Sequence, residues 1–162
     1  GINWTLNRKW TKRNILNLIR EDENVQNYLR NLSAGLRDKK ILVLQEPGDN
    51  NLIDTLKEIP LFQNLQITEG NHHNIERISS NDLTIISTRV LQASSNRDRT
   101  FTEIMTKKTS DKALIFFAPH GEESLDLKKK EFEDINARSL TTVTRASGRL
   151  ANDVLSLLTF LA

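Results

Sequence analysis

Short aliphatic runs recur along this chain, and the stretches between them carry apolar residues at helical spacing. The runs occupy residues 14–19, 41–44, 65–68, 83–88 and 113–118. An unbroken run such as 41–44 is typical of a parallel strand that is covered on both faces. The run at 65–68 is shorter and more polar, so we expect it at an edge of a sheet.

The segments between these runs predict helices. Acidic residues at 21–23 are favoured at a helix start. After them comes one apolar stripe at a spacing of three or four residues, made of Val25, Tyr28, Leu29, Leu32 and Leu36. Shorter helices are expected around 52–59 and 101–105, with a single helical turn at 74–78. Residues 94–99 are polar and predict a loop.

Strands that alternate with helices indicate βαβ units and a mostly parallel sheet. Right-handed crossovers then place helices on both faces of that sheet. We therefore expect a three-layer, Rossmann-like α/β domain whose five strands, counted along the chain, lie in the order 3-2-1-4-5. A ligand in such a fold binds at the carboxyl ends of the strands, where the strand order reverses.

The residues after 122 follow a different pattern, so we expect an α/β domain over 1–122 and a helical extension over 123–162. Within the extension, residues 140–143 form either a short strand or a connector. Its last helix begins near residue 147 and carries an apolar stripe made of Leu150, Val154, Leu157, Leu158 and Leu161. Such a stripe packs on the core, contacts a second subunit or touches a membrane surface.

Composition narrows the possible functions. The 162 residues are 37% apolar and 27% charged, which suits one ordinary domain. The chain has no cysteine, which excludes a disulfide framework, a thiolate zinc site and a cysteine nucleophile. The net charge is only +2, and the basic run at 128–130 is followed at once by acidic residues. Nucleic-acid binding is therefore not expected.

Histidines are the first candidates for chemistry. His72 and His73 are consecutive, so we expect their rings to point in different directions and not to share a metal ion, although Glu69 and Glu76 are close in sequence. His120 follows a strand end, where α/β enzymes often keep an acid or a base.

Other polar residues at strand ends are Glu46, Ser87 and Thr88. Ser87 with His120 and an acidic residue resembles a hydrolase triad, but Ser87 does not lie in the G-x-S-x-G turn that exposes such a nucleophile. The six glycines form neither G-x-G-x-x-G nor G-x-x-x-x-G-K-[ST]. We therefore assign no catalytic, metal-binding or cofactor-binding residue, while a looser nucleotide pocket at the strand ends stays open.

The N-terminal segment is polar and contains Trp4 and Trp10 on either side of Arg8 and Lys9. Tryptophan and arginine are enriched at protein interfaces. Together with the apolar stripe of the last helix, the two tryptophans are the candidate interface residues of the chain.

The same N-terminal residues carry a resemblance to a known family. The sequences Asn3-Trp4 and Asn7-Arg8-Lys9-Trp10, an apolar strand, and then residues 20–24 opening a helix are similar to the cytosolic C-terminal domain of cation-chloride cotransporters. The similarity resumes downstream and covers roughly residues 3–122. Its later parts are a helix at 74–79, a strand at 82–88, a helix at 101–107 and a strand with its loop at 114–122.

This resemblance implies a fold like that of universal stress proteins, with no required enzyme activity. It implies a regulatory domain on the cytoplasmic side of the inner (plasma) membrane, in a prokaryotic transporter of the amino acid-polyamine-organocation superfamily. The expected partners are a second copy of the chain and the transmembrane domain of the same transporter. Two features depart from the family: its glycine-rich stretch is reduced to residues 119–121, and residues 125–162 have no counterpart. The G-x2-G-x9-G-[ST] pattern of stress proteins that bind ATP is missing.

Two other readings remain open. The chain is alternatively a stand-alone stress-type module that binds a small ligand or nucleotide, or a signalling module. A signalling enzyme would need an acidic residue where the strand order reverses, and Glu46 is the candidate for that position.

Overall fold

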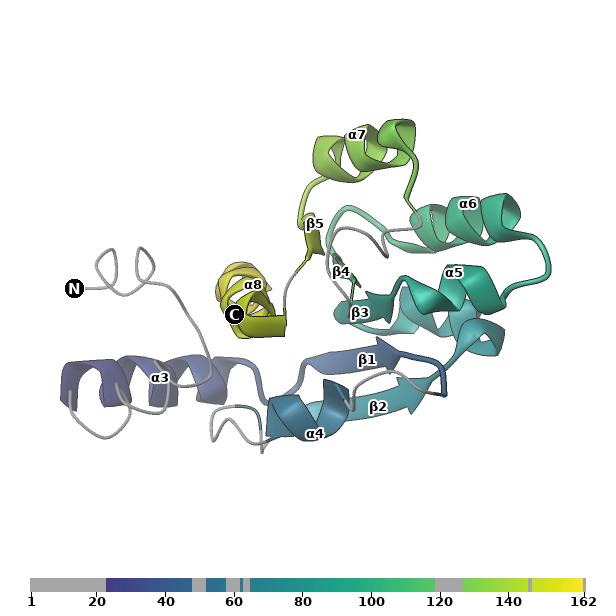
Figure 1. Ribbon diagram of the computed structural model, residues 1–162. Helices are drawn as coiled ribbons and strands as arrows, with labels where there is room; N and C mark the ends of the chain where they lie inside the picture. The colour runs from purple at the N-terminus through teal and green to yellow at the C-terminus, as the bar shows by residue number, and fades with distance from the viewer. Residues whose placement is uncertain are drawn as a thin grey trace.

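The computed structural model describes residues 23–47, 52–57, 62, 65–118, 127–145 and 147–161 (Figure 1). Helices and strands alternate through most of this part of the chain. The elements, in chain order, are α3 (Glu23–Gly35), β1 (Lys40–Leu44), α4 (Leu52–Lys57), β2 (Gln66–Gly70), the 3-10 helix η2 (His72–Ser80), β3 (Leu83–Ser87), α5 (Arg89–Ala93), α6 (Arg97–Lys107), β4 (Ala113–Phe117), α7 (Lys129–Ala137), β5 (Thr141–Thr144) and α8 (Ser147–Leu161).

The five strands form one parallel sheet in the order β2-β1-β3-β4-β5. This confirms the expected α/β fold of the Rossmann-like type. β1, β3 and β4 lie inside the sheet, and every residue of β3 and β4 is buried, as the aliphatic runs predict. β2 is partly exposed and lies at one edge, which confirms its expected position.

The expected strand order was wrong in one respect. A strand over residues 14–19 was expected between the run at 41–44 and the run at 83–88. β1 instead pairs directly with β3, with Ile41 beside Leu83 and Leu44 beside Ile86, so no strand lies between them. Residues 14–19 themselves lie outside the described part of the chain, as do Trp4 and Trp10.

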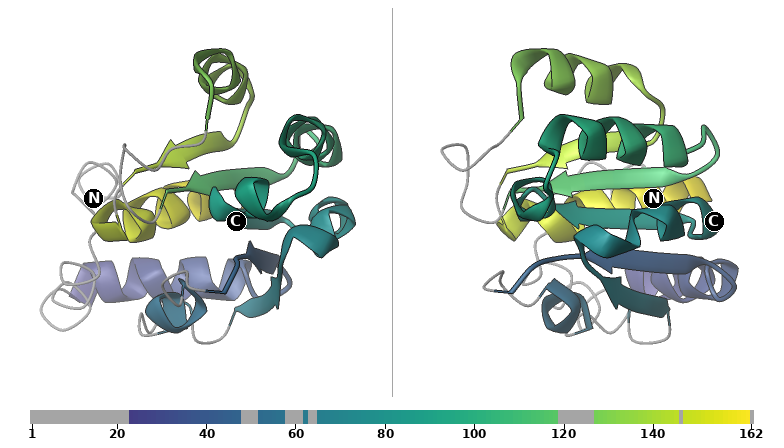
Figure 2. Two further views of the ribbon diagram at one scale, coloured as in Figure 1. Left: turned by 45° about the vertical axis from the view of Figure 1, so that its right-hand side comes forward. Right: turned by 90° about the vertical axis from the view of Figure 1, so that its right-hand side faces the viewer.

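Helices cover both faces of the sheet (Figure 2), and one apolar core lies on each face. Side chains of α3, α4 and α8 pack on one face against residues such as Ile41 and Ile85. Side chains of η2, α5, α6 and α7 pack on the other face against residues such as Leu42 and Ile86. Because successive strand residues point to opposite faces, each aliphatic strand contributes to both cores.

The C-terminal segment belongs to this same sheet and core. Residues 141–144 are a strand, β5, which pairs with β4, so the choice left open between a strand and a connector is settled. The extension over 123–162 is therefore not wholly helical, and it completes the sheet that begins before residue 122. β5 was hard to identify because it is rich in threonine and three of its four residues are only half-buried.

The stripe of α8 packs on the core of its own chain. Leu150, Val154, Leu157 and Leu158 are buried, and Leu161 packs half-buried against the same core. Leu150, Val154, Leu157 and Leu158 therefore have almost no exposed surface to offer a partner, whereas Leu161 keeps part of its surface exposed. Phe160 at the end of α8 is the one large apolar side chain among the described residues that is exposed, at 76%.

Two short helices differ from expectation. Residues 89–93 form α5, which has only Val90 and Leu91 buried and therefore gives a weak sequence signal. The expected loop at 94–99 is shorter than predicted, because Asn96 caps α6 by accepting a hydrogen bond from the backbone N–H of Arg99.

Among the described residues, no helix has both the length and the apolar character needed to cross a bilayer.

Candidate functional site at the carboxyl edge of the sheet

Three polar residues form a row across the carboxyl ends of neighbouring strands. The register pairs Leu44 with Gly70 on one side and with Ile86 on the other. Glu46, His72 and Thr88 follow these pairs by two residues, so each lies just past the carboxyl end of its strand. The strand order reverses between β1 and β3, so this row lies where Rossmann-like folds bind ligands.

Glu46 and His72 are in direct contact. Glu46 Oε1 lies 2.7 Å from His72 Nδ1 and accepts a hydrogen bond of 2.9 Å from the backbone N–H of His72. The Glu46 side chain is 11% exposed and the His72 side chain 24%, so solvent reaches the imidazole more readily than the carboxylate. The carboxylate therefore fixes both the start of η2 and the orientation of the ring.

The local sequence explains why η2 comes this close to β1. A Cβ atom on Gly70 would lie 2.9 Å from both Asn74 Oδ1 and Leu44 Cδ2, so any other residue here would force these side chains to shift. Asn71 then caps η2 by accepting from the backbone N–H of His73, and Asn74 Oδ1 accepts from the backbone N–H of Asn71. These reciprocal bonds hold the first turn of η2 against the end of β1.

Thr88 occupies the other end of the row. The residue is 1% exposed, and its hydroxyl oxygen has no hydrogen-bond partner among the described residues. Its backbone N–H donates to Phe117 O at 2.9 Å, so the main chain is anchored while the side chain is left unpaired. A buried hydroxyl without a partner is uncommon and calls for a specific explanation.

The triad imagined from Ser87 and His120 is not assembled by the described residues. His120 lies outside them. Ser87 is buried, and its hydroxyl oxygen accepts from the backbone N–H of Arg89 at 3.3 Å. Ser87 is the last residue of β3, while Thr88 already has helical backbone angles at the start of α5.

The expectation for the adjacent histidines was wrong. The centroids of the His72 and His73 rings lie 3.9 Å apart with an angle of 40° between the planes, so the rings face each other. The sequence could not show this, because the orientation of His72 depends on Glu46, which is 26 residues away.

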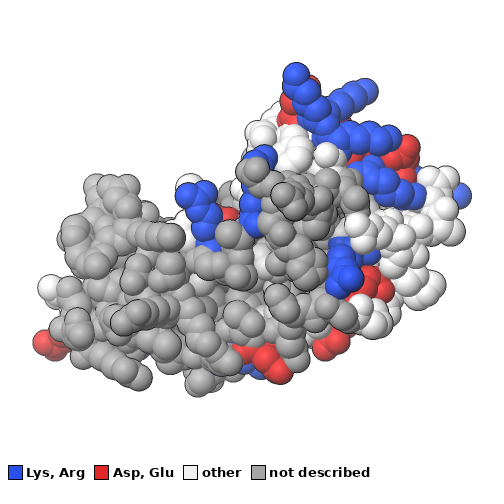
Figure 3. Space-filling model, in the orientation of Figure 1, with Lys and Arg blue, Asp and Glu red and all other residues white. Residues whose placement is uncertain are grey.

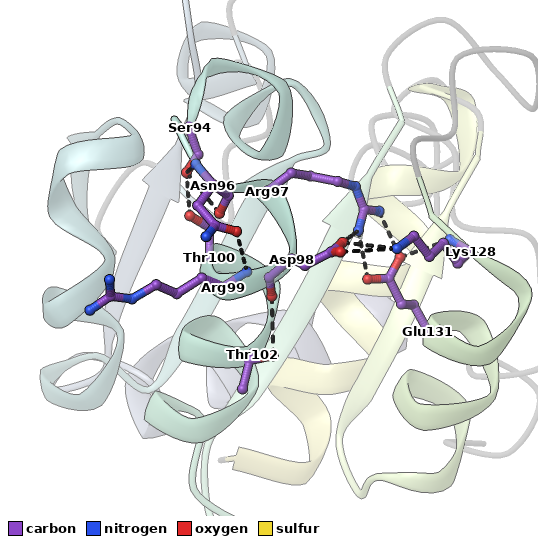
Figure 4. Close-up of polar contacts among 9 residues, drawn as sticks. All are labelled: Ser94, Asn96, Arg97, Asp98, Arg99, Thr100, Thr102, Lys128 and Glu131. Carbon is purple, nitrogen blue, oxygen red and sulfur yellow. Dashed lines mark hydrogen bonds and ion pairs between the residues drawn. The ribbon is translucent and has the colours of Figure 1, made fainter.

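A second polar cluster joins the N-terminal ends of α6 and α7 (Figure 4). Arg97 donates two hydrogen bonds to Glu131, of 2.7 Å and 2.6 Å, in the bidentate arrangement that favours arginine. Lys128 donates to both oxygens of Asp98, and its backbone N–H donates to Glu131 Oε1 at 2.8 Å. The four side chains alternate in sign, so the cluster links two helices without creating a net charge.

The electrostatics of this cluster favour its charged form. Burial by itself would raise the pKa of Glu131, but hydrogen bonds from Arg97 and from the Lys128 backbone outweigh burial and lower the pKa. The hydrogen bond to Glu131 raises the pKa of Arg97. Hydrogen bonds from Lys128 and Arg97 lower the pKa of Asp98. The surface over α7 carries basic side chains with acidic ones among them (Figure 3), so it is not a one-sign patch.

Two basic residues near the other end of α6 have structural partners. Lys108 is buried, which lowers its pKa, and the nearby charge of Arg138 lowers it further. Its ammonium group donates to Ser139 O, and Arg138 donates to Met105 O at 2.9 Å. Both cations therefore satisfy backbone carbonyls at this junction, and neither adds to the row at the carboxyl edge.

The row of His72, Glu46 and Thr88 is the candidate site of this fold. It combines an imidazole, a carboxylate and an unpaired hydroxyl, which suits hydrogen bonding to a small polar ligand. The described residues contain no group of three or more His, Asp or Glu side chains that converges on one point. Comparison of the chain with protein-family models, with curated proteins and with solved structures finds no match.

Proposed function

We propose that this chain is a non-catalytic regulatory and dimerisation domain on the cytoplasmic side of a membrane cation-chloride cotransporter. The observation that carries the proposal is the position of the segments that resemble that family. Residues 74–79 fall in η2, 82–88 cover β3, 101–107 fall in α6 and 114–117 fall in β4. Helix, strand, helix and strand therefore occur in the order that the resemblance requires.

The burial of α8 restricts where a second copy would bind. Its apolar stripe is used within the chain, so a dimer must use another surface. Phe160 is exposed at the end of α8 and is the first described position to test. An exposed aromatic ring is a common anchor of protein interfaces.

Sedimentation equilibrium of the purified chain tests this proposal, together with co-purification of the chain with the membrane domain of such a transporter. We expect a concentration-dependent dimer that Phe160→Ser weakens and that Lys130→Ser, an exposed change on α7, leaves intact. A chain that stays monomeric at every concentration and does not co-purify with the membrane domain would refute the proposal.

The alternative function is a module that binds a small ligand or nucleotide, and the unpaired hydroxyl of Thr88 favours it. A ligand that bonds this hydroxyl would stabilise the folded chain by RT ln(1 + [L]/Kd), so the melting temperature would keep rising as the ligand concentration increases. A thermal-shift screen of nucleotides and small metabolites checks this. Binding that survives Thr88→Val would exclude Thr88 as a contact of that ligand.

A further inference from the structure

α7 is attached to the rest of the fold by few apolar contacts. Ile135 is its one fully buried apolar side chain, and Phe132 is half-buried. The exposed residues of the helix are Lys129, Lys130, Glu133, Asp134, Asn136 and Ala137. In both figures of the whole fold, α7 lies beyond α6 at the outer end of the sheet (Figures 1 and 2). An element with so little buried apolar surface opens locally at a lower free energy than the core does.

Charged groups of α6 tie α7 at both of its ends. At the start of α7, Arg97 donates two hydrogen bonds to Glu131 (Figure 4). At its end, Arg138 donates to Met105 O at 2.9 Å, and Lys108 donates to the carbonyl group that follows Arg138. These charges regain water when the contacts break, which offsets part of the energy that is lost. The polar ties therefore hold α7 in place without making its attachment irreversible.

The turn from α7 into β5 contains a strained residue. Leu140 has a φ of 56°, in the left-handed region that residues with a Cβ atom rarely adopt. Its carbonyl oxygen accepts from the backbone N–H of Leu114 at 2.9 Å, and its side chain packs against the core on the face opposite α7. Such strain persists only where the surroundings enforce it. Release of α7 from α6 would let the backbone at Leu140 relax, as a hinge does.

We propose that α7 is a hinged cover that opens about Leu140 while the parallel sheet stays folded. Opening separates Ile135 and Phe132 from the core that they share with Phe116 and Val143, and so uncovers apolar surface on one face of β4 and β5. A partner that binds this uncovered surface would shift the chain toward the open form. The proposal rests on neither function given above, because it concerns only the contacts of α7.

Native-state hydrogen exchange of the full chain, followed by NMR at increasing low concentrations of urea, tests the cover. We expect the amides of α7 to exchange faster than those of β3. Their exchange should also depend less on urea, because a local opening exposes less surface than global unfolding.

Three variants identify what holds the cover shut. Glu131→Gln weakens the tie to Arg97 and should accelerate exchange in α7 at least about tenfold. Glu133→Gln is the matched control, because it makes the same chemical change at an exposed position of α7 and should leave exchange there unaltered. Leu158→Ala creates a cavity in the opposite core. It should accelerate exchange in β3 at least about tenfold and leave α7 unchanged.

The proposal is overturned if the amides of α7 exchange as slowly as those of β3. It is equally overturned if Leu158→Ala accelerates α7 and β3 by the same factor, because α7 would then open only when the whole chain unfolds. Equal effects of Glu131→Gln and Glu133→Gln on exchange in α7 would show that the tie to Arg97 does not hold the cover shut.

Discussion

Thr84 lies in the middle of β3, and its hydroxyl is buried without a hydrogen-bond partner among the described residues. The residue is 1% exposed. Its neighbours in the register are Leu42 of β1 and Leu114 of β4, which belong to the apolar core on one face of the sheet. Thr84→Val replaces this hydroxyl with a methyl group of similar size.

The expected gain follows from the cost of burying an unpaired hydroxyl. Mutational data place that cost at about 1–3 kcal/mol, and valine removes it while it retains the branched shape that suits a strand. We therefore expect the free energy of unfolding to rise by about 1–2 kcal/mol. For a domain of this size, that corresponds to an increase of about 2–8 °C in melting temperature.

Urea unfolding followed by circular dichroism measures this change, and the slope of the transition should stay constant. Thr144→Val is the matched control, because Thr144 is equally buried in the same sheet but donates its hydroxyl to Asp153. That variant should lose about 1–3 kcal/mol, because it leaves a carboxylate oxygen unpaired. If Thr84→Val is neutral or destabilising, the hydroxyl of Thr84 is satisfied and the reasoning fails.

Three further predictions concern other parts of the molecule. Gly70→Ala should destabilise the fold by about 1–3 kcal/mol, because the added methyl group would lie 2.9 Å from side-chain atoms of Asn74 and Leu44. Urea unfolding measures this change. An unchanged midpoint of the transition would show that η2 can move away from β1. Glu131 has a lowered folded pKa, so its stabilisation is present at neutral pH and is lost as pH falls through that pKa. Glu131→Gln should therefore be less stable at pH 7 and approach the unmodified chain only once the pH falls below that lowered pKa, as followed by melting temperature against pH. A constant difference at all pH values would contradict this. Leu158→Ala should cost about 2–5 kcal/mol at every protein concentration, whereas a cost that depends on concentration would place α8 at a subunit interface.

The interior strands could be predicted from sequence because their burial leaves an unambiguous pattern. Residues 83–87 and 113–117 contain almost no polar side chains, and all of them are buried. β5 has no such pattern, because it is an edge strand in which three of the four residues are threonine and three are only half-buried. An aliphatic run also does not show which strands pair with it. The prediction therefore placed the run at 14–19 beside 41–44, whereas β3 pairs with that strand.

The candidate site was predictable only in part. Glu46 and Thr88 were identified because a parallel sheet brings strand ends to one edge. The contact of Glu46 with His72 depends on the register between Leu44 and Gly70 and on the close approach that Gly70 permits. The contact between the tilted His72 and His73 rings involves a His72 ring that Glu46 orients, so the local sequence alone does not reveal it.

The position of α8 also bears on how the protein folds during synthesis. α8 is the last described element to leave the ribosome, yet six of its residues, Leu150, Ala151, Val154, Leu155, Leu157 and Leu158, belong to the core under β1, β3 and β4. Until these residues emerge, one apolar face of the nascent sheet lacks part of its cover. That exposed apolar face is a binding surface for chaperones. A stop codon before residue 147 would leave it uncovered and yield an aggregation-prone chain that proteases degrade.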